Sequence, residues 1–161
     1  MSTHQPLHAA LIGAGPLGIN IYRHALKRPD IIISQVVDID PSLKGKDMGE
    51  HAGLDATGVF ISDSLEQGKR ADIAILATVS DLPRIGPQLL ALIDAGLSVV
   101  STCEELFYPW NSSDEWSKTI DLAAKDKGVA VLGTGVNPGF LMDSLPAMLT
   151  GICSQVEKIE V

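Results

Sequence analysis

The sequence has no long hydrophobic run, only two cysteines and few charged residues for a chain of 161 residues. No apolar segment approaches the roughly 20 residues that a membrane-spanning helix needs. Charged residues make up 20% of the chain and hydrophobic residues 45%, which argues against intrinsic disorder. Cys103 and Cys153 are far apart and lack CxxC spacing, so neither a disulfide framework nor a zinc motif is expected. These absences predict a soluble globular domain with reduced thiols and no membrane segment.

Clustered positive charge, a signal sequence and metal-ligand spacing are absent as well. The 12 basic residues are scattered and the formal net charge is -8, which argues against a nucleic-acid partner and favours a small molecule. Residues 1–8 lack the basic and apolar regions of a signal peptide, so we expect a cytoplasmic location. The four histidines show no shared spacing, and no metal site is expected. They are His4, His8, His24 and His51.

What the sequence does contain is an alternation of strand and helix patterns. Helical periods or caps mark 16–27, 83–95 and 113–127, the last with Ser113 as its N-cap and Gly128 at its end. Apolar, β-branched runs predict strands at 8–12, 30–40, 58–62, 72–78, 98–101 and 129–132. Residues 41–57 show no firm period. Strands alternating with helices predict an α/β fold with a doubly wound parallel sheet, the Rossmann arrangement.

The C-terminal part predicts the start of another unit. A helix is expected over about 141–149, and 156–161 (VEKIEV) alternates apolar and polar residues like an antiparallel strand with one exposed face. We therefore divide the chain into an NAD(P)-binding Rossmann domain, 1–150, and the beginning of a second α/β domain for substrate and oligomerisation, 151–161. On this interpretation the chain stops where a second sheet begins.

A glycine fingerprint follows the first predicted strand. Gly13, Gly15 and Gly18 match GxGxxG, with Pro16 and Leu17 between the last two. The first glycine permits a tight turn, the second lets the backbone approach a pyrophosphate, and the third lets the helix pack closely on the sheet. Because the motif lies between a predicted strand and a predicted helix, it indicates a dinucleotide site.

Asp38 supports this interpretation, because it ends the second predicted strand about 20 residues after Gly18. Its carboxylate would bind an adenosine ribose and repel a 2′-phosphate, which favours NAD. Alternatively, Asp38 only ends the strand ahead of Pro41. Lys44 and Lys46 could offset the repulsion and admit NADP, or they are solvated loop residues. The cofactor is therefore NAD or NADP.

Two later strand ends add candidates, since ligands bind at the carboxyl edge of such sheets. Ala77 and Thr78 follow the fourth strand, and Thr102 and Glu104 follow the fifth. In extended chain, adjacent side chains point oppositely, so only one of Glu104 and Glu105 is expected to enter a cleft and act as a general acid or base. Alternatively, these are ordinary loops with surface charges.

After the last strand, 133–139 (GTGVNPG) contains three glycines and a proline, which suits close backbone approach to a ligand. The side chain of Asn137 could then hydrogen bond to a nicotinamide or a substrate. A structural turn between two domains is the alternative.

Together, GAGPLG, VVDIDPSLKGKD, ILAT, STCEELFYP and GTGVNPGFLMD resemble the 2,4-diaminopentanoate dehydrogenase family and its amine dehydrogenase relatives, which are related to the dihydrodipicolinate reductases. The resemblance implies that an NAD(P)H hydride reduces an iminium made from a ketone and ammonia, or that the reverse reaction oxidises an amine. It implies Glu104 as the acid/base and Asn137 near the nicotinamide. It also implies a homodimer formed through a second domain that would follow 161.

Two other functions stay open from the sequence. A dihydrodipicolinate reductase-like imine reductase would use the same cofactor turn with a different substrate. A nucleotide-binding module without catalysis is the other alternative, since the expected substrate domain is missing from the sequence.

Overall fold

A six-stranded, all-parallel sheet forms the centre of the molecule, with strand order β3-β2-β1-β4-β5-β6. The computed structural model describes residues 5–111 and 113–160, so His4 and Val161, which the sequence interpretation included, lie outside the described residues. The strands are β1 (Leu7–Ile12), β2 (Ile31–Val37), β3 (Ile61–Ser62), β4 (Ile73–Leu76), β5 (Ser98–Ser101) and β6 (Val131–Gly133). This order is that of a Rossmann dinucleotide-binding domain, which confirms the predicted fold class.

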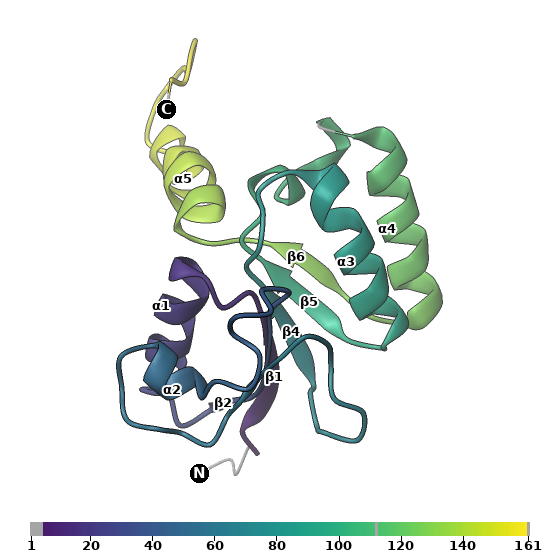
Figure 1. Ribbon diagram of the computed structural model, residues 1–161. Coiled ribbons are helices and arrows are strands. Elements are labelled where there is room, and N and C mark those ends of the chain that lie inside the picture. Colours follow the sequence, from purple (N-terminus) through teal and green to yellow (C-terminus); the bar gives the residue numbers. More distant parts are fainter. Residues whose placement is uncertain (1–4, 112, 161) are drawn as a thin grey trace.

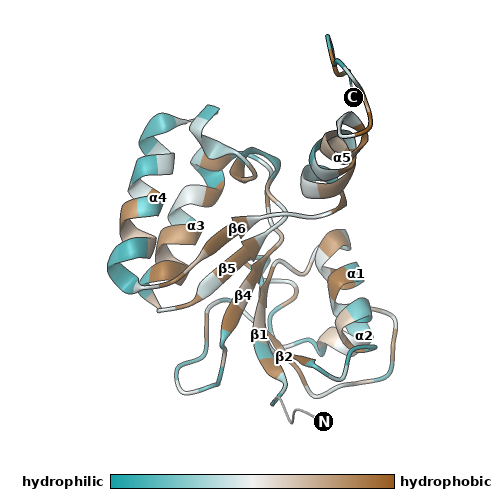
Figure 2. Ribbon diagram, turned by 180° about the vertical axis from the view of Figure 1, so that it is seen from behind, coloured by the Kyte–Doolittle hydropathy of each residue, from teal (hydrophilic) through white to brown (hydrophobic). Residues whose placement is uncertain are grey.

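Helices cover both faces of the sheet (Figure 1). The α-helices are α1 (Pro16–Ala25), α2 (Met48–His51), α3 (Leu82–Asp94), α4 (Asp114–Lys127) and α5 (Leu145–Thr150). Alternation along β4 shows the two layers: Ala74 and Leu76 belong to the core shared with α3 and α4, whereas Ile73 and Ile75 pack against the core under α1 and α2. Figure 2 shows the strands as the hydrophobic centre and α4 as largely hydrophilic on its outer surface.

Local sequence signals correctly predicted several element ends. Ser113 caps α4 by accepting a hydrogen bond from the backbone N–H of Trp116, and Gly128 ends the helix in the left-handed conformation with φ of 67°. The predicted helix 83–95 is α3, which begins one residue earlier, after its N-cap Asp81. By contrast, α2 was not predicted, because four residues held by a cap carry no helical period.

The C-terminal part differs from the prediction. The expected helix over 141–149 is in fact η3 (Val136–Ser144), irregular at Asn137, followed by the short helix α5. The strand expected at 156–161 is wrong within the described residues, since 155–160 has no regular structure and is exposed. A strand needs a neighbour for its backbone hydrogen bonds, and the only sheet in the described part of the chain ends at β3 and β6. The division into 1–150 and 151–161 stays a prediction.

None of the helices in the described residues is long and apolar enough to cross a bilayer.

Candidate functional site

A cleft of about 910 Å³ lies at the carboxyl ends of β1, β2 and β4 and is closed on one side by α3. From β1 the chain builds the sheet outward through β2 and β3 on one side, and then through β4, β5 and β6 on the other side. The switch point therefore lies between β1 and β4, and open α/β sheets bind ligands at such a point. The cleft brings together five of the residues predicted from sequence: Gly13, Gly15, Asp38, Ala77 and Thr78. Pro16 and Leu17 begin α1 beside it without lining it.

Gly13 and Gly18 meet strict packing demands in the turn between β1 and α1. Gly13 has φ of 106°, and a Cβ there would lie 2.5 Å from the carbonyl oxygen of Ala77. A Cβ on Gly18 would collide with the carbonyl oxygen of Gly13. Both glycines therefore let the turn fit against the end of β4 and let α1 pack onto the turn.

Gly15 is different, because nothing in the chain requires a glycine there. Its backbone has φ of -71° and ψ of -172°, which any residue adopts, and no atom lies within 4 Å of an added Cβ. Its N–H and that of Leu17 have no acceptor within the described residues. Free amides at the start of a helix bind phosphate groups. An open space beside such amides is the shape that a pyrophosphate would need.

Asp38 holds the turn as well as lining the cleft. Its Oδ2 accepts a hydrogen bond from the N–H of Ala14 at 2.7 Å, and its Oδ1 accepts one from the N–H of Asp40 at 2.9 Å. The carboxylate is thereby fixed at the carboxyl end of β2, beside the glycine turn. Lys44 is paired with Asp63 at 2.5 Å, so this pair carries no net charge.

The segment that contains α2 lies behind the glycine turn, a contact that sequence analysis missed. Nε2 of His51 lies 2.9 Å from the carbonyl oxygen of Ala14. Arg23 of α1 donates to the carbonyl oxygen of Ala52 through Nε at 2.8 Å. No local signal predicts these bonds, since the two partners in each are separated by 37 and 29 residues, respectively.

Asp47, the N-cap of α2, organises this segment. Four backbone N–H groups donate to its buried carboxylate, those of Gly49, Glu50, Thr57 and Gly58, the shortest at 2.7 Å. Burial by itself would raise the pKa of Asp47, but these hydrogen bonds outweigh it and hold the pKa below the ordinary value of 3.8.

We expect Asp47→Asn to lower the free energy of unfolding near pH 7 and to flatten its acid dependence. A carboxyl whose pKa is lowered by folding stabilises the native state above the unfolded pKa, and this stabilisation is lost as pH falls through the folded pKa. Urea unfolding from about pH 7 down to about pH 3 measures the effect. Asp55→Asn is the control, because Asp55 lies in the same segment and its side chain makes no hydrogen bond within the described residues. Equal acid sensitivity in Asp47→Asn and wild type would contradict the prediction.

Glu104 and Glu105 lie in a 3-10 turn, η1 (Glu104–Leu106), and not in the extended chain that we expected. Glu105 accepts a hydrogen bond from the N–H of Leu82 at 2.7 Å and so caps the start of α3. Glu104 is exposed and has no side-chain hydrogen bond within the described residues. Within the described residues, the side chain of Glu104 is therefore exposed and unbonded, whereas that of Glu105 is held at the start of α3.

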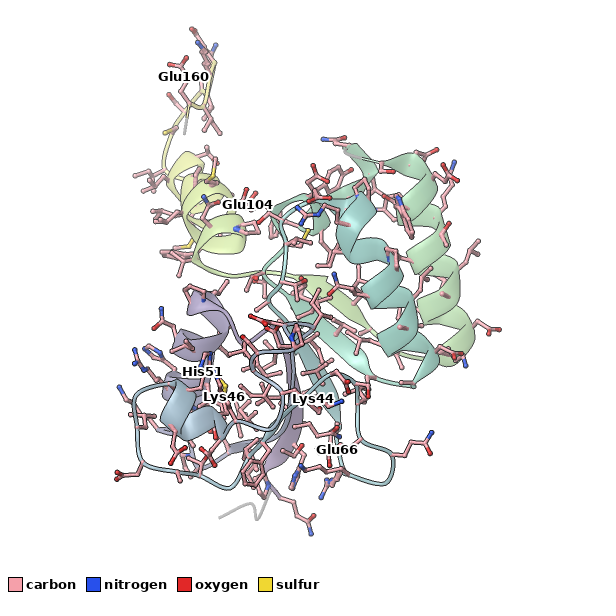
Figure 3. The ribbon with its side chains drawn as sticks, in the orientation of Figure 1. Lys44, Lys46, His51, Glu66, Glu104 and Glu160 are labelled. Carbon is pink, nitrogen blue, oxygen red and sulfur yellow. The ribbon has the colours of Figure 1, made fainter. Side chains whose placement is uncertain are left out.

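Thr102, Glu104 and Asn137 lie outside the lining of the cleft. They follow β5 and β6, at the same carboxyl edge of the sheet. The N–H of Thr102 donates to the carbonyl oxygen of Leu76 at 3.3 Å, which joins the ends of β5 and β4. Asn137 is exposed in η3, and Figure 3 shows Glu104 between α3 and α5 in that view.

Comparison with known proteins shows two close resemblances. The chain is 32% identical over 154 residues to the 2,4-diaminopentanoate dehydrogenase of Acetoanaerobium sticklandii, covering 92% of this chain and 43% of that protein. The structure of an amine dehydrogenase from Mycobacterium smegmatis superposes with a TM-score of 0.88 at 29% identity, covering 97% of this chain and 47% of the other. No family model matches the sequence.

A more distant structure carries a bound dinucleotide. The WlbA dehydrogenase of Bordetella pertussis, solved with NADH and UDP-GlcNAcA, superposes with a TM-score of 0.59 at 25% identity, covering 82% of this chain and 36% of that protein. The chain spans less than half the length of each of these relatives. Over nearly all of its own length it is similar to the N-terminal part of 2,4-diaminopentanoate and amine dehydrogenases.

Proposed function

We propose that this chain is the NAD(P)-binding part of an oxidoreductase that acts on carbon-nitrogen bonds, by reductive amination of a ketone with ammonia or oxidative deamination of an amine. One observation carries the cofactor assignment. Gly15 is glycine although neither its backbone nor its packing requires it, and it lines a cleft where its own N–H and that of Leu17 have no acceptor among the residues that the structure describes. The names of the relatives support the reaction class.

The residues at the cleft divide the binding work. The amides of Gly15 and Leu17, at the start of α1, would hold the pyrophosphate, with Pro16 setting the first turn of the helix. Asp38 would bind the adenosine ribose, while Ala77 and Thr78 line the cleft at the end of β4, next to Gly13. These groups position and orient a dinucleotide without taking part in chemistry.

The segments after β5 and β6 would serve the reacting end. The bound nicotinamide would supply or accept the hydride at the carbon that bears nitrogen. Glu104 would give and take the protons of amine and water, as a general acid and base. Thr102 and Asn137 would contact the nicotinamide end of the cofactor. A homodimer in the complete protein is part of the same proposal.

A titration with NADH and NADPH, followed by ligand fluorescence and thermal shift, tests the cofactor assignment, since a ligand that binds only the native state raises its stability. We expect saturable binding. If neither nucleotide binds, the proposal is contradicted.

Activity assays then test the reaction class. Turnover of a simple ketone with ammonia would indicate an amine dehydrogenase, and turnover of a cyclic imine dicarboxylate would indicate an imine reductase. Cofactor binding without either activity would support a nucleotide-binding module.

We expect NADH to bind more tightly than NADPH, because the fixed carboxylate of Asp38 would face the 2′-phosphate and Lys44 is already paired with Asp63. Asp38→Asn keeps an oxygen for the N–H of Ala14 and removes the charge. This variant should lower the ratio of Kd for NADPH to Kd for NADH by at least about fivefold. The reason is that repulsion between like charges roughly 4 Å apart costs about 1 kcal/mol or more. Asp40→Asn is the control, since Asp40 does not line the cleft. An unchanged ratio in Asp38→Asn would exclude Asp38 as the discriminating group.

A further inference from the structure

His51 and Asp38 hold the residue between the first two glycines from two sides. Asp38 accepts from the N–H of Ala14 at 2.7 Å, and Nε2 of His51 lies 2.9 Å from the Ala14 carbonyl oxygen. A carbonyl oxygen only accepts, so the histidine is the donor. Ala14 is fully buried and His51 is half-buried. The position between Gly13 and Gly15 is therefore fixed at both its backbone polar groups.

The carbonyl group of Ala14, which accepts the hydrogen bond from His51, belongs to the same peptide group as the N–H of Gly15. In a trans peptide, the C=O and the following N–H lie in one plane and point in opposite directions. The Asn137–Pro138 bond is the one cis peptide in the described residues, so the peptide from Ala14 to Gly15 is trans. A donor on the Ala14 carbonyl at the back of the turn therefore sets the direction of the Gly15 N–H at the front, and polarises it as a donor.

His51 comes from a segment that is itself anchored. Asp47 accepts four backbone hydrogen bonds at the start of α2. Arg23 of α1 donates a hydrogen bond to the carbonyl oxygen of Ala52, the residue after His51. Figure 3 shows His51 beside α1, on the side of the turn away from Glu104. A side chain fixed in this way can orient the turn and does not merely follow it.

We propose that His51 is a positioning residue of the cofactor site, which orients the Gly15 amide toward the pyrophosphate through the Ala14 carbonyl. This inference rests on the proposed dinucleotide function. It predicts an effect confined to ligands that contain the pyrophosphate. A role in stability alone would change the unfolding midpoint without that selectivity.

The test compares His51→Ala and His51→Gln with wild type, using NADH, ADP-ribose and adenosine as ligands. Because one hydrogen bond contributes about 1 kcal/mol, His51→Ala should weaken the binding of NADH and ADP-ribose about fivefold and leave the binding of adenosine unchanged. His51→Gln places an amide donor near the position of Nε2 and should restore affinity to within about twofold of wild type. His24→Ala is the matched control: His24 also bonds to a backbone carbonyl, that of Asn20 at 2.8 Å, but on α1 and away from the turn.

The outcomes separate this inference from the proposed function. If wild type binds no dinucleotide, the proposed function fails and this inference fails with it. If wild type binds NADH and folded His51→Ala binds it equally well, only the role of His51 is overturned. Equal losses for adenosine and NADH, or no rescue by His51→Gln, would also overturn it.

Discussion

Replacing Gly15 by valine is expected to abolish dinucleotide binding while the domain stays folded. A Cβ added at this position meets no atom of the described residues within 4 Å apart from its chain neighbours, and the backbone is in an ordinary extended conformation. It would instead fill the space in front of the free amides of Gly15 and Leu17. We expect Kd for NADH to rise at least about a hundredfold, since steric exclusion and lost amide-phosphate hydrogen bonds each cost about 2 kcal/mol. Fluorescence titration gives Kd, and circular dichroism with thermal unfolding reports the fold.

Gly18→Ala is the contrasting variant from the same motif. Its added Cβ would collide with the carbonyl oxygen of Gly13, so the loss should appear in the free energy of unfolding, by roughly 2 to 3 kcal/mol. Normal NADH binding by folded Gly15→Val would show that no phosphate group approaches that part of the turn. The two glycines therefore test the ligand and the fold separately.

Glu104→Gln is expected to reduce kcat about 10²- to 10⁴-fold in the protein that shows turnover, and to leave Kd for NADH unchanged. Positioned general acids and bases contribute rate factors of this size. The amide has nearly the same shape as the carboxylate and cannot exchange the proton. Steady-state rates of amination, measured beside a cofactor titration, separate the chemical step from binding.

Glu105→Gln is the matched control for this variant. The side chain of Glu105 accepts from the N–H of Leu82 at the start of α3, and glutamine keeps an oxygen that can accept the same bond. We expect a small change in stability and a kcat near that of wild type. If Glu104→Gln keeps the wild-type kcat, Glu104 is not the general acid or base. If kcat falls further in Glu105→Gln than in Glu104→Gln, that role belongs to Glu105.

The sequence by itself predicted the sheet and the glycine turn, because their signals are local. Buried strands need apolar, β-branched runs, and the run at 98–101 is β5 without a shift of either end. The turn between β1 and α1 needs a glycine at Gly13 because φ is positive there, and a glycine at Gly18 because a Cβ would collide. These two positions lie within six consecutive residues, so the sequence motif predicts the turn. The cap at Ser113 and the left-handed Gly128 are equally local.

Only the tertiary structure showed which groups act together. The bond from His51 to Ala14, and that from Glu105 to Leu82, join segments that no periodicity connects. The expectation that Glu104 and Glu105 lie in extended chain was wrong, because a 3-10 turn begins at Glu104, three residues after the last residue of β5. The strand expected at 156–161 was wrong because alternation describes only the faces of a strand, whereas pairing requires a neighbour that the described chain does not place there.

Composition, periodicity and glycine spacing determined the fold class and the position of the glycine turn, since each depends on residues close in sequence. Packing decided the rest. It assigned Glu105 to the start of α3, left Glu104 without a side-chain hydrogen bond in the described residues, paired Lys44 with Asp63 and placed His51 behind the turn. The physical reason is that hydrogen-bond partners are chosen by distance in space, which the chain sets only after its layers have packed together.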